Sequence, residues 1–475
     1  MIRVRVAPSP TGFLHIGGAR TYIFNWLFAR QKGGVMVLRL DDTDLERNTE
    51  EARQSIFDGL RWLELPWDQE YSQSERAAWH RQAAEALLAK DLAYRDFTPA
   101  GAEPESEKTH TGTPWLFHPG QREIPRAESD RRAAAGEPFV IRFRVPRETV
   151  PELRFDDAVY GPQARSTGDI EDFALLRSDG NPTYHLASCA DDADLRITHV
   201  IRGQDHLANT FKHLLIFEGM GAAGPQFAHL PLLLAPDGAK LSKRRHGQVV
   251  SVTAYRDAGF LPHAFVNFLS LLGWSPKDNR EVLTRQELVD SFSLEGIHRH
   301  NAVVAYQEND PENWADPKSL WLNAQHLRTM PIDELAPHAQ RVLNYDGDNL
   351  EWFRRTVDLL RARYSTLRDF PVRGAAYFGE QFSIEAAARE KLDVPGARDL
   401  LRELGERLAA TPEFTEATVE RDLRALAAER SVKAGVIINA ARAALTGQSV
   451  GPSAFAVFAA IGRDRAIRRL REPQC

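Results

Sequence analysis

Apolar residues in the first 95 positions form short runs that are separated by helical patterns. Residues 35–40 are nearly all apolar, which is typical of a strand buried on both faces of a parallel sheet. Residues 2–6 predict a shorter strand, and a helix is expected from about residue 19 to residue 30, before Gly33 and Gly34. The pattern therefore predicts the strand–helix–strand unit of a parallel α/β sheet.

The pattern changes at about residue 98. Residues 98–137 are polar and rich in Pro, Gly, Glu and Arg, which predicts an inserted segment with long loops. Apolar residues alternate over residues 139–145, as in a half-exposed strand of a small antiparallel element. Residues 173–176, a turn at 178–182 and residues 183–185 predict a strand and its return.

The α/β pattern resumes with a strand at residues 198–202, a helix at 207–218 and an apolar run at 227–235. From residue 255 onward helical periodicity dominates. Further helices are expected at residues 352–367, 397–409, 420–429, 432–445 and 453–470. The sequence thus predicts an interrupted parallel sheet followed by one or two helical domains.

Composition excludes several classes of protein. The 475 residues are too many for one compact core, so two to four domains are expected. No run approaches the roughly 20 apolar residues of a membrane span, and the polar N-terminus lacks an apolar signal core, so we expect a cytoplasmic protein. The net charge of −6 does not indicate a nucleic-acid partner. Because the only cysteines are Cys189 and Cys475, neither a disulfide framework nor a cysteine-rich zinc site can form.

Two separate segments suggest a phosphate site. A turn with His15, Gly17 and Gly18 connects the first strand to the first helix, where backbone N–H groups, the positive helix end and a histidine favour a bound phosphate. Far along the chain, the basic segment KLSKR contains Lys240 and Lys243. Alone, such a turn often serves loop geometry and such a charge run is usually solvated. Together they indicate a nucleotide site.

Charged residues follow several predicted strands. Asp41 and the acidic residues after it end the strand at 35–40, at the ligand-binding edge of a parallel sheet, although helix capping explains them equally well. Arg5 and Arg202 end two other strands, and planar guanidinium groups suit carboxylates. Without further context, a surface ion pair explains either arginine, and Tyr184 is explained as an ordinary core residue.

These residues lie in motifs that resemble the bacterial glutamyl-tRNA synthetases. In order, the motifs are PSPTG and HIGG between Pro8 and Gly18, RLDDTD from Arg39, PTYHLA from Pro182, VIRG from Val200 and KLSKR from Lys240. WLN at residue 321 and the segment 432–447 extend the resemblance nearly to the C-terminus. The resemblance implies a class I synthetase with a Rossmann-type parallel-sheet catalytic domain, an α+β insertion and an all-α C-terminal region.

The resemblance also implies a domain arrangement. Residues 1–95 and 183–238 would be the two halves of the catalytic domain, and residues 96–182 the inserted domain that binds the acceptor end. Residues 239–325 would hold the KLSKR loop and a helical domain that contacts the tRNA stem. Residues 326–475 would bind the anticodon.

By the same resemblance, the expected substrates are L-glutamate, ATP with Mg²⁺ and tRNA(Glu), and the enzyme is expected to be a monomer that forms glutamyl-adenylate, usually after tRNA has bound. The implied catalytic residues are His15, Lys243 and Lys240. The implied ATP-binding residues are Pro8, Ser9, Thr11, Gly12, His15, Gly17, Gly18 and Lys243. The implied glutamate-binding residues are Arg5, Ser9, Asp41, Tyr184 and Arg202. Arg361 and Arg363 would contact the anticodon, unless they only form a solvent-exposed face.

The chain departs from the family pattern at three positions. Asp41, Ser188 and Gln204 stand where glutamate, asparagine and an acidic residue are common. The departures raise the alternative of a catalytically silent tRNA-binding paralogue, against which the retained catalytic residues weigh. A further alternative is an enzyme that also glutamylates tRNA(Gln).

Some relatives hold zinc in the insertion. Here that segment offers His110 and His118 but no cysteine, so no zinc is expected. Near the C-terminus, the arginines between residues 463 and 471 would contact phosphates or keep a helix soluble.

Overall fold

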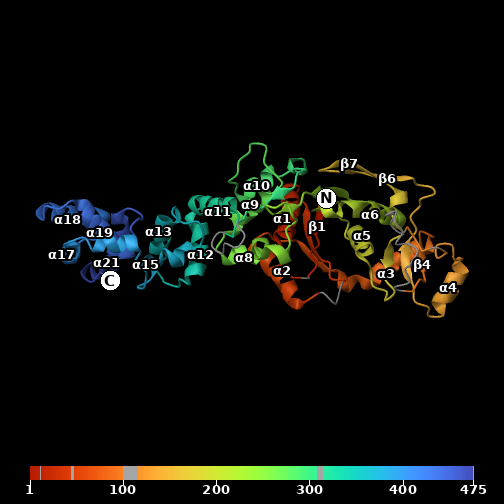
Figure 1. The fold of residues 1–475 in the computed structure, drawn as a ribbon, viewed down its shortest axis with the longest axis horizontal. Helices are drawn as coiled ribbons and strands as arrows, with labels where there is room; N and C mark the ends of the chain where they lie inside the picture. Colours follow the sequence, from red (N-terminus) through yellow and green to blue (C-terminus); the bar gives the residue numbers. More distant parts are fainter. Residues whose placement is uncertain (11, 44–47, 100–115, 119, 307–313, 474–475) are drawn as a thin grey trace. The chain divides into compact units, whose positions relative to one another are not determined.

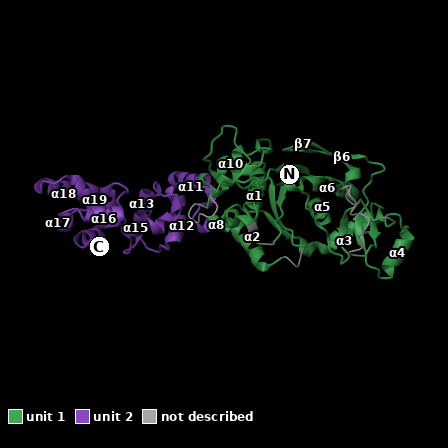
Figure 2. Cartoon of the chain, in the orientation of Figure 1, with its two compact units in different colours: residues 1–255, 265–317 green, residues 256–264, 318–475 purple. Residues whose placement is uncertain are grey.

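The computed structural model describes the chain except for residues 11, 44–47, 100–115, 119, 307–313 and 474–475 and the side chains of residues 243 and 244 (Figure 1). The chain forms two compact units (Figure 2). Unit 1 comprises residues 1–255 and 265–317, and unit 2 comprises residues 256–264 and 318–475. Among the described residues, no helix combines the length and the apolar character that crossing a bilayer requires.

A seven-stranded sheet organises unit 1. Its order is β3 (Gln69–Ser72), β2 (Val35–Leu40), β1 (Arg3–Val6), β9 (His199–Gly203), β10 (Gln226–Leu230), β6 (Glu152–Asp157) and β7 (Gly161–Ser166). The strands from β3 to β6 pair in parallel, with Val4 beside Met36 and Val200 beside Phe227, whereas β6 and β7 form an antiparallel hairpin. The predicted Rossmann-type α/β class is confirmed.

Helices connect the parallel strands, as crossover connections require. They are α1 (Ile16–Gln31), α2 (Glu50–Trp62), α3 (Ala77–Ala89), α5 (Tyr184–Asp194) and α6 (Leu207–Met220). The helix α1 starts earlier than predicted because His15 caps it. The helix α6 runs past Gly219 and ends at Gly221, whose φ of 71° is the left-handed conformation that glycine adopts without strain.

The inserted segment forms a second, antiparallel sheet of β4 (Ala93–Asp96), β5 (Val140–Phe143) and β8 (Ala174–Leu176). Its helix α4 (Arg126–Ala134) lies within the stretch for which long loops were predicted. The hairpin of β6 and β7 also comes from the insertion but joins the main sheet.

The prediction of a returning strand at residues 183–185 was wrong. Thr183 occupies the N-cap position and Tyr184 begins α5. The buried residues Leu186 and Ala190, at i and i+4, supply the apolar face of a helix instead.

The rest of unit 1 contains short elements that follow the main sheet. They are β11 (Leu233–Leu234), α7 (Lys243–His246), α10 (Arg285–Ser291) and β12 (Ala302–Val303). Two further helices, α8 (Val252–Asp257) and α9 (Pro262–Leu271), lie where the chain passes between the units.

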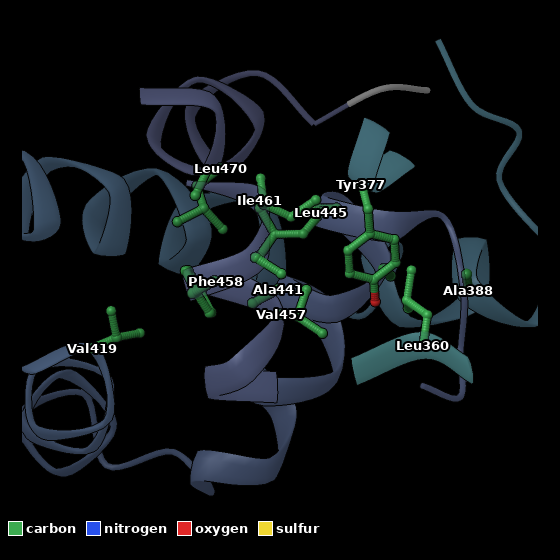
Figure 3. Close-up of a cluster of buried hydrophobic side chains, with 14 of the residues drawn as sticks. Leu360, Tyr377, Ala388, Val419, Ala441, Leu445, Val457, Phe458, Ile461 and Leu470 are labelled. Atoms are coloured by element: carbon green, nitrogen blue, oxygen red, sulfur yellow. The ribbon is translucent and has the colours of Figure 1, made fainter. Parts of the chain in front are cut away.

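Unit 2 is helical in its described part. Its longer helices are α11 (Pro317–Thr329), α12 (Ile332–Leu343), α13 (Leu350–Arg361), α17 (Ala397–Ala410), α18 (Glu416–Glu429), α19 (Ala434–Thr446), α20 (Ala454–Ile461) and α21 (Arg463–Arg471). Shorter helices are α14 (Asp369–Val372), α15 (Ala375–Phe378) and α16 (Ala386–Leu392). Their apolar faces meet in one core, in which Tyr377, Leu445 and Ile461 lie close together (Figure 3).

The single helix predicted at residues 453–470 is two helices, because Gly462 breaks the pattern with a φ of 86°. The arginines that follow are largely structural. Arg469 is buried and donates to the carbonyls of Ala376, Leu445 and Gly379 at 2.7–2.8 Å. It therefore satisfies the ends of neighbouring helices and is not available to a phosphate.

Candidate active site

A cavity of about 510 Å³ opens in unit 1 at the carboxyl ends of β1, β2 and β9. This is the edge at which parallel α/β sheets bind ligands, and the volume suits a small molecule. The predicted site residues that line it are Arg5, Pro8, Ser9, His15, Gly17, Gly18, Asp41, Tyr184, Arg202 and Lys240. Gly12 is not among the lining residues, and Thr11 lies outside the described residues.

The His15 turn forms one wall of this cavity. The Nδ1 atom of His15 accepts a hydrogen bond from the Gly17 N–H at 2.9 Å and so caps α1. A Cβ atom on Gly17 would lie 3.2 Å from that Nδ1, so a larger residue would crowd the ring. The first turn of a 16-residue helix is thereby presented to the cavity, where its N–H groups and dipole stabilise an anion.

Arg5 and Arg39 share one buried carboxylate, that of Asp192. Its Oδ1 accepts from Arg5 Nε at 3.1 Å and from Arg39 Nη1 at 2.7 Å. Arg39 also donates to both oxygens of Asp41, at 2.7 and 3.3 Å. Burial raises the pKa of Asp41, while the permanently charged Arg39 favours its ionised form. Arg5, Arg39, Asp41 and Asp192 thus form a buried group of opposite charges, to which Asp191 adds a longer contact with Arg39 at 3.9 Å.

The helix α5 supplies this carboxylate. Tyr184, Ser188 and Asp192 follow one another at four-residue spacing, so they share a face of the helix. The Ser188 hydroxyl accepts from Arg39 Nη2 at 3.4 Å. The sequence analysis missed Asp192 because it placed a strand at the start of this segment. The helical spacing of its apolar residues was the signal that could have revealed it.

Arg202 differs from Arg5, because the atoms that it contacts are neutral. They are Nε2 of His229 (3.2 Å), the Tyr184 hydroxyl (3.1 Å), Nδ1 of His213 (3.3 Å), the His206 carbonyl (3.3 Å) and the Thr210 hydroxyl (2.8 Å). Among the residues that the structure describes, no carboxylate is paired with Arg202. Its side chain is 5% exposed, and burial lowers the pKa of its guanidinium. Arg202 is therefore a buried cation whose direct contacts are all neutral; the carboxylate of Asp157 is reached only through His229.

The histidines around Arg202 are neutral near pH 7. Burial, reinforced by nearby cations, lowers the pKa of His185 and that of His206 to about 4 each. Burial also lowers the pKa of His213 and that of His229. A neutral imidazole accepts a hydrogen bond from Arg202 but supplies no opposite charge. The groups that contact Arg202 at this wall of the cavity therefore carry no negative charge.

The basic segment approaches the same cavity through Lys240. Its Nζ pairs with Asp205 Oδ2 at 2.8 Å, and both residues line the cavity. Lys243 begins α7, and its side chain lies outside the described part of the structure. Gln204 donates to Asn301 Oδ1 at 2.8 Å and accepts a hydrogen bond from the Tyr160 hydroxyl. The neutral amide at this position thus forms polar contacts of its own.

Other predicted residues lie away from this cavity. In unit 2, Arg361 donates to the Met330 carbonyl and pairs with Asp358 at 2.7 Å, whereas Arg363 is exposed. In the insertion, His118 Nδ1 lies 2.5 Å from Asp96 Oδ2. His110 lies outside the described residues.

Comparison with known proteins gives matches over nearly the whole chain. The family described as tRNA synthetases class I (E and Q), catalytic domain, matches residues 1–309, and the anticodon binding domain matches residues 333–473. The glutamate–tRNA ligase of Solibacter usitatus is 55% identical over 473 residues, which cover 99% of this chain and 98% of the relative. That of Desulfotalea psychrophila is 42% identical, with the same two coverages. A crystal structure of a glutamate tRNA ligase from Elizabethkingia meningosepticum, in complex with its amino acid, superposes with a TM-score of 0.82 at 30% identity and covers 99% of both chains.

Proposed function

The chain belongs to the class I glutamate–tRNA ligases, and from that premise we propose that it activates L-glutamate with ATP and transfers the glutamyl group to the 3′ end of tRNA(Glu). The observation that carries the proposal is the charge of the cavity. Arg5 and Arg39 pair directly with carboxylates, whereas every direct contact of Arg202 is neutral. L-Glutamate, with two carboxylates and one ammonium, brings a carboxylate that can pair directly with Arg202.

The same charge explains a preference for glutamate over glutamine. Glutamine is neutral overall, so its binding would leave the buried Arg202 without a carboxylate in direct contact. An uncompensated buried charge typically costs several kcal/mol. We assign the side-chain carboxylate to Arg5 and Arg202, with Tyr184 beside it, and the α-amino group to Ser9 and Asp41. The two bonds from Arg39 hold Asp41 in place for that contact.

For ATP we assign the wall around the His15 turn. The residues are Pro8, Ser9, Thr11, Gly12, His15, Gly17 and Gly18, together with Lys240 and Lys243 from the basic segment. The helix end and the lysines would stabilise the triphosphate, which is expected to arrive with Mg²⁺. Because the cavity joins the glutamate and phosphate walls, both substrates can meet in it.

The reaction then needs positioned charge more than a protein nucleophile. An α-carboxylate oxygen of glutamate attacks the α-phosphorus, the bond to the bridging oxygen breaks, and pyrophosphate leaves with the electron pair. A hydroxyl of the terminal adenosine of tRNA next attacks the activated carbonyl, and AMP leaves. Lys243 and His15 would stabilise the charge that develops on the phosphate oxygens in the first step.

The remaining segments would bind tRNA. We assign residues 96–182 to the acceptor end, residues 239–325 to the stem and residues 326–475 to the anticodon. Exposed Arg363 is better placed for a base than Arg361, whose guanidinium is already engaged. We expect a cytoplasmic monomer that holds no zinc.

ATP–pyrophosphate exchange in the presence of tRNA(Glu) tests the proposal. Exchange should require L-glutamate, and glutamine should be poorer in kcat/KM by roughly 10⁴-fold, as for sites that hydrogen-bond a group which the analogue lacks. Absence of glutamate-dependent exchange would refute the proposal and favour a silent paralogue. Aminoacylation of purified tRNA(Glu) and tRNA(Gln) then decides whether one or both are charged.

A further inference from the structure

The guanidinium of Arg202 is connected by hydrogen bonds to two buried residues that do not line the cavity, His229 and Asp157. Arg202 Nε donates to His229 Nε2 at 3.2 Å, and His229 Nδ1 lies 2.6 Å from Asp157 Oδ2. All three residues are at most 5% exposed. The three side chains form a continuous line of hydrogen bonds that ends at the cavity wall.

We propose that Asp157, acting through His229, is a positioning residue for Arg202: it fixes the ring tautomer that keeps Nε2 as an acceptor and thereby aims the guanidinium at the substrate carboxylate. This inference rests on the proposed function, since it assumes that Arg202 binds glutamate. Neither Asp157 nor His229 lines the cavity in the described structure, so neither is expected to touch the substrate.

The direction of each proton follows from the neighbours. Arg202 has donors alone, so the Nε2 of His229 that it contacts is an acceptor, and the Thr210 hydroxyl, 3.2 Å away, can donate to the same atom. The neutral ring therefore carries its proton on Nδ1 and donates it to Asp157. Burial lowers the pKa of His229 despite that carboxylate. Burial alone would raise the pKa of Asp157. The bond with His229 and the bonds from the backbone N–H groups of Tyr160 and Val159 outweigh burial and lower this pKa. An ionised aspartate and a neutral histidine are thus the stable pair.

The carboxylate itself is held rigidly. Asp157 Oδ1 accepts from the N–H groups of Val159 at 3.0 Å, Tyr160 at 2.9 Å and His229 at 3.3 Å. These bonds close the turn between β6 and β7 and leave Oδ2 for the ring. Because Asp157 ends β6 and His229 lies in β10, the line connects the inserted hairpin to the substrate wall.

This geometry makes Asp157→Asn a sharp probe. The amide oxygen would take the position of Oδ1, where three N–H groups require an acceptor, so the amide NH₂ would face His229 Nδ1. The ring would then carry its proton on Nε2, which could no longer accept from Arg202 Nε and would have the Thr210 hydroxyl, 3.2 Å away, as its acceptor. The change keeps the shape of the side chain and reverses the tautomer of the ring. In a Ser-His-Asp catalytic triad, replacing the aspartate by asparagine lowers kcat for the same reason.

Steady-state exchange with tRNA present measures the effect. For Asp157→Asn, the KM for glutamate should rise about ten- to hundredfold, the range expected for a hydrogen bond to a charged group. The KM for ATP should stay within about twofold. The control Asp156→Asn, on the exposed neighbour in the same strand, should match the parent. For His229→Gln, an amide oxygen can face Arg202 while the amide NH₂ faces Asp157, so this variant should retain the parent KM within about threefold.

The proposal is overturned if Asp157→Asn leaves the glutamate KM unchanged, or if it raises the glutamate and ATP KM values equally. Failure of the proposed function looks different, because the parent enzyme itself would then show no glutamate-dependent exchange. If Asp157→Asn does not fold, ¹⁵N NMR of the parent histidine rings still decides. A protonated Nδ1 on His229 supports the proposal, and a protonated Nε2 refutes it.

Discussion

Asp192 is the carboxylate on which the buried charges of the cavity most depend, so Asp192→Asn is a direct test of the charge balance. The substitution keeps the size of the side chain but removes the only carboxylate paired with Arg5 among the described residues, and it leaves Arg39 with Asp41 and, at 3.9 Å, Asp191. At about 4 Å and an effective dielectric constant of about 20, each ion pair with Asp192 is worth roughly 4 kcal/mol. Relief of the burial of the carboxylate offsets part of the loss. The expected destabilisation is therefore about 3–5 kcal/mol, as for other broken buried pairs.

Thermal unfolding of the full chain measures this change. For a unit of this size, about 2 °C is lost per kcal/mol, so the transition of unit 1 should fall by about 6–10 °C. Asp194→Asn is the matched control, because Asp194 lies in the same helix and its pairing with Arg76 is exposed to solvent. The control should destabilise the protein by less than about 1 kcal/mol. Equal melting temperatures for the two variants would show that Asp192 does not hold the arginines, and the charge argument would be wrong.

Three further predictions concern the same chain. Lys243→Ala should slow glutamate-dependent exchange by about 10²–10³-fold with an unchanged melting temperature, as for the loss of one preorganised donor; a normal exchange rate would remove Lys243 from the mechanism. The pKa values of His185 and His206 are lowered to about 4, against about 6.5 in the unfolded chain, so the unfolded state binds more protons between these two pH values. The melting temperature should therefore fall as the pH drops from 6.5 to 4. The fall should be less steep in His206→Gln than in the exposed control His300→Gln. Elemental analysis of the purified protein should find well under one zinc per chain, and one equivalent would contradict the proposal of a zinc-free insertion.

The sequence was sufficient for the α/β class and for the edge of the sheet at which a ligand would bind. Asp41 follows β2, while Arg5 and Arg202 lie near the carboxyl ends of β1 and β9, and the carboxyl ends of parallel strands meet at one edge. The order of the strands was less accessible. Strand β6 joins the main sheet from within the insertion, and its alternating burial does not distinguish a partner in one sheet from a partner in another.

The charge balance of the site could not be derived from the sequence, because it depends on contacts between distant residues. Asp192 pairs with Arg5 across 187 positions and with Arg39 across 153 positions. In the sequence, an Asp-Asp pair next to an Ala is typical of a solvated helix face. The folded structure is needed to show that Asp192 is buried and pairs with two arginines.

The contrast between Arg5 and Arg202 gives the cavity its selectivity for charge. Both guanidinium groups are buried, and each needs acceptors for its N–H groups. Arg5 obtains them for Nε and Nη2 from a carboxylate, which also pairs with its charge. Arg202 obtains them from imidazole, hydroxyl and carbonyl groups, which satisfy its donors and leave its charge intact.

Neutral acceptors thus orient the guanidinium of Arg202 without pairing with its charge, whereas a carboxylate would do both. They orient the guanidinium of Arg202 before the substrate arrives, and they leave its charge for the substrate to compensate. A carboxylate in place of His229 would orient Arg202 equally well but would pair directly with its charge, and the preference for glutamate depends on leaving that pairing to the substrate. By this reasoning His229→Gln preserves the preference, because an amide is as neutral as the imidazole, and His229→Glu abolishes it even where the fold survives.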